Sequence, residues 1–249
     1  MINTIFEHRS IRKYKSDPID DAVLNKILEA GIRASTFGNM QVYSMVVTKD
    51  EELRKQLLPL HFNQGMVIQA PVHITFCADF NRFNKWCKQR GAEPGYDNFM
   101  SLMMASTDAL LASQNVALEA EAHGLGICYL GTVLYNAQKF IDLLKLPKGV
   151  FPVTAVVLGY PDENPPLTDR LPAEGVVHYE TYRDFSEADI DRMYAEKEAL
   201  PSTQELLKVN ELPNLARIFT EKRYTKKDNV AVSEHMLDVA KKQGFWNHD

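Results

Sequence analysis

The pattern of apolar and polar positions predicts strands and helices that alternate along the chain. Apolar runs at residues 43–48, 71–79 and 152–159 are typical of strands. Apolar residues with helical spacing fill residues 21–32, directly after Asp20, which can cap that helix. Because predicted strands and helices alternate along the chain, we expect the fold class to be α/β or α+β.

The longest helical pattern covers residues 97–123 and is followed by Gly124, a common C-terminal stop. Small and apolar side chains occupy most of its circumference. We therefore expect this helix to be buried on nearly all sides, in a core or against a partner subunit. Asn136 is the capping candidate of a further helix, which ends at Leu146 before Pro147.

Two other segments shape the expected organisation. Residues 81–96 are polar and contain two glycines and a proline, which predicts a long loop with a functional or mobile character. After about residue 185, charged helical stretches and prolines dominate. We expect a core at residues 1–185 and a C-terminal helical extension or arm at residues 186–249.

Composition narrows the class of protein. The net charge is −5, so no overall basicity favours nucleic-acid binding. No apolar run reaches 18 residues and the N-terminus has no secretory pattern, so we expect neither a membrane span nor secretion. The three cysteines, Cys77, Cys87 and Cys128, form no CxxC pair, which favours reduced thiols and a cytoplasmic location.

Common motifs of metal and nucleotide chemistry are missing. The chain has no HExxH, paired CxxC, Walker A or GxSxG motif, and its seven histidines are scattered, so we expect no metal site. The segment GLGICYLG, with Gly124, Gly126 and Gly131, is similar to the glycine-rich fingerprint of dinucleotide-binding folds. It fails because Tyr129 stands where the third glycine is required. A helix end followed by a tight turn is the simpler interpretation.

Two arginine-containing motifs are candidates for anion binding. In HRSIRKY, Arg9 and Arg12 are three residues apart and can share one face of a short helix, with His8 and Ser10 beside them. Guanidinium groups suit phosphate oxygens, and Arg170 of DRLP can reach an anion in the same way. The alternatives are a solvated basic helix and an ordinary surface arginine.

The loop STFGNMQ is the third candidate. Ser35, Thr36, Asn39 and Gln41 place four hydrogen-bonding side chains within seven residues, and Gly38 permits unusual backbone angles. Such a loop can bind a polyol or the edge of a heterocycle. An ordinary turn between a helix and a strand is the alternative.

Taken together, the motifs follow the order of a known family. HRSIRKY, the STFGNMQ loop, QAPVHITFCAD, GLGICYLG, PVTAVVLGYP and RLP resemble the nitroreductase family in sequence and order. The resemblance is greatest to the larger NADPH-linked nitroreductases and flavin reductases, whose closing helix is similar to FTEKRYTKKDNVAVSEHMLDVAKKQGFW. It covers most of the chain and is weakest at residues 186–215.

The resemblance implies a homodimer with an α+β fold, in which helices flank a central mixed sheet. The helix at residues 97–123 matches the long buried helix of the family's subunit contact. Two FMN molecules are expected at the dimer interface, each contacted by both chains. Small molecules are the implied partners, with no nucleic acid and no membrane.

The site residues are likewise implied by the resemblance. HRSIRKY matches contacts to the flavin phosphate, ribityl chain or ring edge, the STFGNMQ loop matches a second flavin loop from the partner, and Gln64 matches a ring-edge contact. The backbone at Leu130 and Gly131 matches the segment that approaches the isoalloxazine. The expected FMN-binding residues are His8, Arg9, Ser10, Arg12, Ser35, Thr36, Asn39, Gln41, Gln64, Tyr129, Leu130, Gly131 and Arg170.

The implied activity is hydride transfer from NADPH or NADH, through flavin N5, to a nitroaromatic, quinone or flavin acceptor in a ping-pong cycle. FMN carries this chemistry, so no catalytic side chain is assigned. Thr168 stands where the subgroup often has a lysine, and the donor preference stays open. The alternatives are another FMN-dependent reduction, such as dehalogenation or enone reduction, and a flavin-storage module without turnover.

Overall fold

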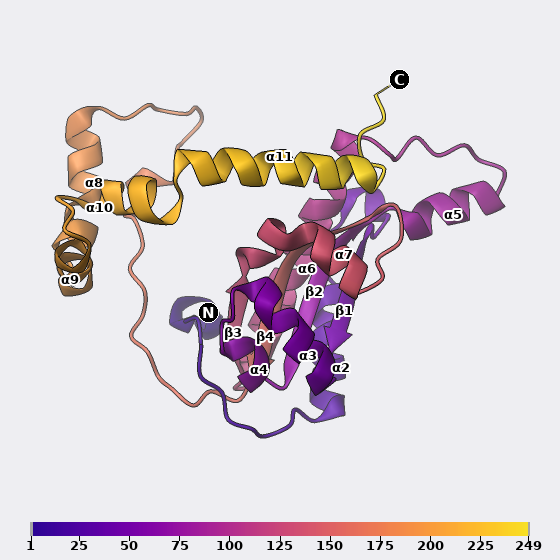
Figure 1. Cartoon of the computed structure of the whole chain (residues 1–249), viewed down its shortest axis with the longest axis horizontal. Helices are drawn as coiled ribbons and strands as arrows, with labels where there is room; N and C mark the ends of the chain where they lie inside the picture. The colour runs from indigo at the N-terminus through magenta and orange to yellow at the C-terminus, as the bar shows by residue number, and fades with distance from the viewer. Residues whose placement is uncertain (1, 249) are drawn as a thin grey trace. The chain divides into compact units, whose positions relative to one another are not determined.

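The protein is described by a computed structural model that covers residues 2–248 (Figure 1). Its contacts define two compact units. The first runs to Pro166 and includes the chain from Val232 onward, and the second is Leu167–Ala231. This division falls earlier in the chain than residue 185, and the functional division expected there stays a prediction.

A four-stranded sheet forms the centre of the first unit, and all its strand pairs are antiparallel. The expected α+β class is confirmed. The parallel component of the implied mixed sheet is limited, in the described residues, to an isolated bridge between Ser10 and Ile127. In order across the sheet, the strands are β1 (Tyr43–Thr48), β2 (Val72–Asp79), β4 (Val150–Gly159) and β3 (Gly126–Leu130).

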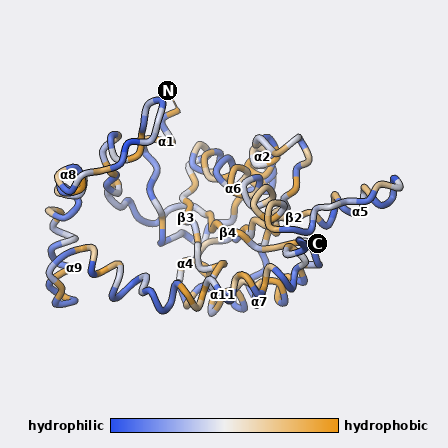
Figure 2. Tube along the Cα trace, turned by 90° about the horizontal axis from the view of Figure 1, so that it is seen from above, coloured by the Kyte–Doolittle hydropathy of each residue, from blue (hydrophilic) through white to orange (hydrophobic). Residues whose placement is uncertain are grey.

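Helices cover both faces of this sheet, as the view from above shows (Figure 2). Helices α2 (Asp21–Ile32) and α6 (Phe99–Ala122) lie on one face. On this side, Ile74 and Phe76 of β2 pack with the small residues of α6 in one core cluster. The other face is covered by α3 (Glu51–Leu57), η2 (Leu58–His61), α4 (Met66–Gln69), η3 (Gly131–Asn136) and α7 (Ala137–Leu143).

Local signals account for where the helices begin and end. The Asp20 carboxylate accepts the Ala22 N–H at 2.6 Å and caps α2. The Asn98 side chain accepts the Ser101 N–H at 3.1 Å and caps α6. Gly124 adopts a φ of 76° just beyond α6, a conformation that favours glycine. The helices predicted after Asp20 and before Gly124 are therefore confirmed.

One local prediction is wrong, and a second is confirmed only in part. Residues 81–96 do not form one long loop, because α5 (Asn81–Gln89) occupies more than half of them. The polar composition reflects an exposed helix. Asn136 stands at the N-cap position of α7, as expected, but its side chain makes no capping hydrogen bond. Its Nδ2 donates to the Leu60 carbonyl at 2.8 Å and ties η3 to η2 instead.

The second unit is helical. Helix α8 (Glu187–Ala199) begins with a capping box in which Ser186 and Asp189 satisfy each other's backbone N–H groups. Pro201 is the first residue of α9 (Pro201–Asn210) and does not interrupt it. None of the described helices is long and apolar enough to cross a bilayer. The remaining elements are α1 (Asn3–Glu7), η1 (Phe37–Asn39), η4 (Ala173–Gly175), α10 (Leu215–Arg217), a π-helical turn (Ile218–Arg223) and α11 (Lys226–Lys242).

Candidate functional site

The HRSIRKY segment is extended and not helical, which corrects the expectation that Arg9 and Arg12 share a helix face. Ser10 bridges Ile127 of β3, and the Ile11 N–H donates to the Ile127 carbonyl at 2.8 Å. A Cβ on Gly126 would lie 2.6 Å from Ile11 Cγ1, so the missing side chain lets this segment lie close against β3. Alternation along an extended chain then places Arg9 and Arg12 on opposite sides.

Contacts distinguish the two arginines. Arg9 lines a cavity of about 290 Å³ with Glu121, and its Nη1 donates to Asn164 Oδ1 at 2.5 Å. Arg12 is exposed, and its backbone N–H donates to Glu163 Oε1 at 2.5 Å. Within residues 2–248 the Arg12 guanidinium has no hydrogen-bond or ion-pair partner, so it is the member of the pair free to bind an anion.

His8 is fixed against α6. Its Nδ1 lies 2.6 Å from Glu121 Oε1, and the side chain of Glu121 is only 12% exposed. Burial raises the pKa of Glu121, and the hydrogen bond from His8 opposes that rise. His8 is therefore engaged within the protein, next to the segment that carries Arg12.

The end of β3 presents backbone to open space. Leu130 is buried, whereas Gly131 is exposed, and a Cβ on Gly131 would meet no atom within 4 Å. The Tyr129 hydroxyl lies 3.1 Å from Ser113 Oγ of α6, which holds its ring away from that space. A flat group can therefore approach the backbone at Gly131 closely, as the flavin expectation requires.

Gln64 is held near this strand end through His61. The Gln64 N–H donates to the His61 carbonyl at 3.2 Å, across a turn in which Phe62 and Asn63 have left-handed backbone angles. The His61 ring is fully buried, and its Nδ1 lies 2.6 Å from the hydroxyl of Thr132, the residue after Gly131. The structure thus links two predicted flavin contacts.

A second histidine completes this arrangement. His61 Nε2 lies 2.9 Å from Nε2 of His73, which is buried in β2. Burial lowers the pKa of His61 to about 4. Burial, followed by the neighbouring His61, lowers the pKa of His73 to about 3, and the Arg54 guanidinium acts in the same direction. Both rings are therefore neutral at physiological pH.

The STFGNMQ loop is anchored by a carboxylate from the middle of α6. Asp108 is fully buried and accepts the N–H groups of Phe37 at 3.0 Å and Val42 at 3.2 Å. Between these anchors, Asn39 and Gln41 have positive φ, and Gln41 Nε2 donates to Asn39 Oδ1 at 2.7 Å. The loop is thus preorganised, with its polar side chains exposed or half-exposed.

The predicted flavin contacts of the first unit fall into two groups. The Asp108-anchored loop belongs to the layer of α2 and α6 on one face of the sheet. Leu130 belongs to the layer on the other face, which also holds η2 and η3 around Gln64 and Gly131. One chain therefore does not bring all of these residues together.

Arg170 lies in the second unit. Its Nη1 donates to the backbone carbonyls of Thr168 at 3.1 Å and Asp169 at 2.9 Å, and within the described residues it has no carboxylate partner. The Asp169 carboxylate pairs with Lys197 Nζ at 2.6 Å. Lys197 therefore lies next to the residue that follows Thr168, but its charge is already paired with Asp169.

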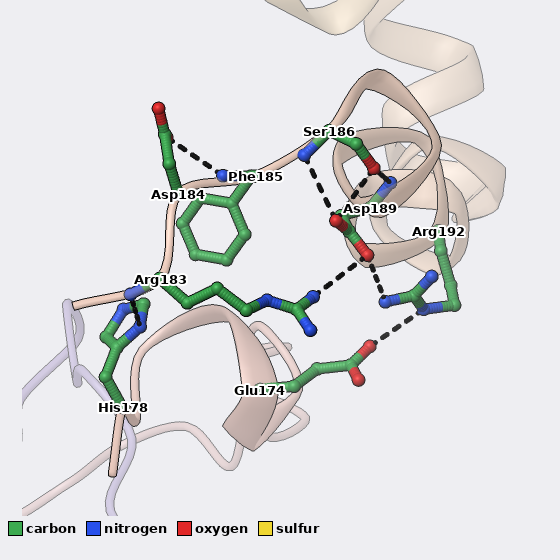
Figure 3. Close-up of polar contacts among 8 residues, drawn as sticks. All are labelled: Glu174, His178, Arg183, Asp184, Phe185, Ser186, Asp189 and Arg192. Atoms are coloured by element: carbon green, nitrogen blue, oxygen red, sulfur yellow. Dashed lines mark hydrogen bonds and ion pairs between the residues drawn. The ribbon is translucent and has the colours of Figure 1, made fainter. Parts of the chain in front are cut away.

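Two other arginines of this unit are already paired (Figure 3). Asp189 accepts from Arg192 at 2.9 Å and from Arg183 at 3.3 Å, and Arg192 Nε contacts Glu174 at 3.0 Å. Hydrogen bonds from Ser186, followed by the one from Arg192, hold the pKa of Asp189 well below its ordinary value. This network fixes the segment before α8 and leaves Arg170 as the more available cation.

Comparisons with known proteins assign the family. A model of the nitroreductase family matches residues 5–160. The chain belongs to the nitroreductase family. It is 38% identical over 186 residues to an oxygen-insensitive NADPH nitroreductase of Salmonella typhimurium, covering 75% of this chain and 76% of the relative. The expected family membership is thereby confirmed.

Solved structures of this family agree along almost the whole chain. A Bacteroides fragilis crystal structure is 51% identical, with a TM-score of 0.97 over 98% of this chain and 100% of its own. The NADPH:FMN oxidoreductase of Vibrio harveyi, in complex with NAD⁺, is 30% identical, with a TM-score of 0.78 over 98% of this chain and 97% of its own. The nitroreductase fold therefore includes the C-terminal part that the family model leaves unmatched.

The sequence did not predict the buried residues that hold the candidate contacts in place. Asp108 is a lone charge in an apolar helical stretch, and that isolation was a usable signal. His61 and His73 are twelve residues apart, at no helical spacing, so only the fold brings them together. Within residues 2–248, no three His, Cys, Asp or Glu side chains gather as metal ligands would.

Proposed function

We propose that this nitroreductase-family protein is an FMN-dependent oxidoreductase that uses NADPH or NADH to reduce nitroaromatic, quinone or flavin acceptors. One observation carries the proposal: the backbone at Gly131 faces open space, and Gln64 is connected through His61 to Thr132, the residue that follows Gly131. The family match and the names of the relatives support the same chemistry.

The residues present fit FMN on physical grounds. Arg12 offers an exposed guanidinium without a partner in the described chain, which suits a phosphate or the electron-rich edge of the ring. Arg170 has only backbone partners in its own unit and is the second phosphate candidate. Ser10 and Asn39 add hydrogen-bonding groups, and Gln64 donates to the ring edge.

When bound, FMN would take hydride from NAD(P)H at N5 and pass it to an acceptor that later occupies the same site, which is a ping-pong cycle. The chain's part is to position and to stabilise charge. Arg12 and Gln64 would hold the N1 and O2 side of the ring and stabilise the negative charge that develops there on reduction. No side chain is assigned the transfer of a proton.

The proposal includes a homodimer. In the single chain, α6 exposes a stripe of large apolar residues: Met100, Met103, Leu110 and Leu111 are between 45% and 62% exposed. Their spacings of three, seven and one residues, at about 3.6 residues per helical turn, place all four along one side of α6. A second copy that covers this stripe buries it and brings its own Asp108-anchored loop to the site.

Anaerobic titration with NADPH and NADH, in parallel, tests the proposed function. We expect purified protein to carry bound FMN, and its oxidised absorption to bleach with at least one donor and to return when a quinone or nitroaromatic is added. Protein that neither contains nor takes up FMN would contradict the proposal. Bound FMN that neither donor reduces would support a storage role instead.

Arg12→Ala tests the assignment of the anion site. Loss of a charge-assisted hydrogen bond costs roughly 1.5–3 kcal/mol, so we expect FMN to dissociate roughly 10- to 100-fold more readily. Lys13→Ala is the matched control, because it removes the same charge from the next, also exposed, residue. Equal FMN dissociation constants for the two variants would remove Arg12 from the site.

A further inference from the structure

The Thr132 hydroxyl occupies a distinctive position between the candidate site and a buried chain of hydrogen bonds. Thr132 is half-buried and follows Gly131, beside which space is open. Its Oγ1 lies 2.6 Å from His61 Nδ1, and His61 Nε2 lies 2.9 Å from His73 Nε2. A continuous chain of hydrogen-bonded polar atoms therefore runs from the strand end into the core.

Only two arrangements of hydrogen atoms make both the Thr132–His61 and the His61–His73 contacts hydrogen bonds. Both rings are neutral, and a single hydrogen lies between the two Nε2 atoms. In the first, His73 donates to His61, and His61 donates from Nδ1 to Thr132. The hydroxyl hydrogen of Thr132 is then free to be donated elsewhere. In the second, His61 donates to His73, and Thr132 must donate inward to His61 Nδ1.

Burial separates the two arrangements. His73 Nδ1 is buried and forms no hydrogen bond of normal geometry among the described residues. The backbone of His73 itself acts to raise the pKa of the ring, but a contact within one residue has poor hydrogen-bond geometry and does not replace a partner. The second arrangement puts a hydrogen on His73 Nδ1 and leaves a buried N–H donor unsatisfied. The first leaves only an acceptor unsatisfied, which folded proteins tolerate more often than a lost donor. The first arrangement is therefore favoured.

We propose that His61 and His73 form a positioning relay that directs the Thr132 hydroxyl hydrogen outward, to an acceptor on the edge of the bound flavin ring. This inference rests on the proposed function, because it needs the flavin at Gly131. Thr132 is the binding residue, and the two histidines act through it. The Gln64 N–H on the His61 carbonyl ties the same histidine to a second ring contact.

The Thr132 variants provide the direct test. Thr132→Val removes the hydroxyl at nearly constant shape, and we expect FMN to bind on the order of 3- to 10-fold more weakly. Thr132→Ser restores the hydroxyl and should restore the affinity. Thr75→Val is the matched control, because it removes a buried hydroxyl that has no partner, from the same strand as His73.

The histidines are tested through the same contact. Asn at position 61 can keep a donor near Nδ1, whereas Gln places its amide near Nε2. We expect His61→Asn to retain FMN affinity and His61→Gln to lose it as Thr132→Val does. In the double variant His61→Gln/Thr132→Val the losses should not add, because both remove one contact.

A tautomer measurement does not depend on activity. Nitrogen-15 NMR of histidine-labelled protein, with and without FMN, should show His61 protonated at Nδ1 and His73 protonated at Nε2. The opposite tautomers, or equal FMN affinity of wild type and Thr132→Val, would overturn the relay. Wild-type protein that does not bind FMN would instead remove the proposed function, so the two failures are distinguishable.

Discussion

The buried histidine pair should make folding stability depend on pH. The pKa of His61 falls from an ordinary 6.5 to about 4 on folding, and that of His73 to about 3. Between these values and pH 6.5, the unfolded chain binds more protons than the folded protein. Stability therefore rises with pH in this range and is lost as pH falls below about 6.5.

The size of the effect follows from the same pKa values. At about pH 5, a histidine of the unfolded chain is almost fully protonated, while His61 stays mostly neutral in the fold. The resulting loss of unfolding free energy, relative to about pH 8, is roughly 2 kcal/mol for this residue. His73 contributes in the same direction, and the two rings titrate as a coupled pair.

His61→Gln isolates the contribution. Urea unfolding at fixed protein concentration, at about pH 8 and at about pH 5, gives the two free energies. We expect the wild type's advantage over the variant to shrink by roughly 2 kcal/mol at the lower pH. Asp108 and Glu121, whose pKa values burial raises, act with the opposite sign but are present in both proteins.

His235→Gln is the control for this comparison, because His235 is exposed to water on α11. The control should follow the wild-type dependence on pH. If His61→Gln also follows it, the ring of His61 does not stay neutral in the folded state, and the hydrogen-bond reasoning built on that neutrality is wrong.

Two further changes address the loop and the subunit contact. Asp108→Asn leaves one of the Phe37 and Val42 N–H groups without an acceptor, which should cost roughly 1–3 kcal/mol and lower the urea midpoint. An unchanged midpoint would contradict the anchoring role. Leu110→Glu places a charge on the apolar stripe and should give monomers in sedimentation, whereas Val209→Glu, at a 70% exposed position, should not. A dimeric Leu110→Glu protein would place the contact elsewhere.

The sequence predicted most elements of the fold because their signals are local. The strand at 43–48, the cap at Asp20 and the stop at Gly124 depend on residues within one or two turns. The loop predicted at residues 81–96 was wrong because an exposed helix and a polar loop have the same kind of amino-acid composition. The position of Asn136 at the start of α7 was predicted correctly, but the bond that its side chain makes was not, because its partner Leu60 is far away in the sequence.

The candidate site was predictable only in part. The motifs located the segments that carry the candidate contacts. The helical geometry predicted for Arg9 and Arg12 was wrong, because the segment pairs with β3 and is therefore extended. The support from His61 depends on contacts to residues far along the chain, such as Thr132. Sequence spacing carries no signal for such contacts.

The placement of the two groups of predicted flavin contacts on opposite faces of one sheet has a thermodynamic consequence. If each ligand contacts one face of the sheet in one protomer and the opposite face in another, ligand binding and dimer formation are linked equilibria. Each then promotes the other. Dilution of the protein then favours release of the ligand as well as dissociation of the dimer. Every substitution also appears twice in the assembly, once in each of two symmetry-related sites.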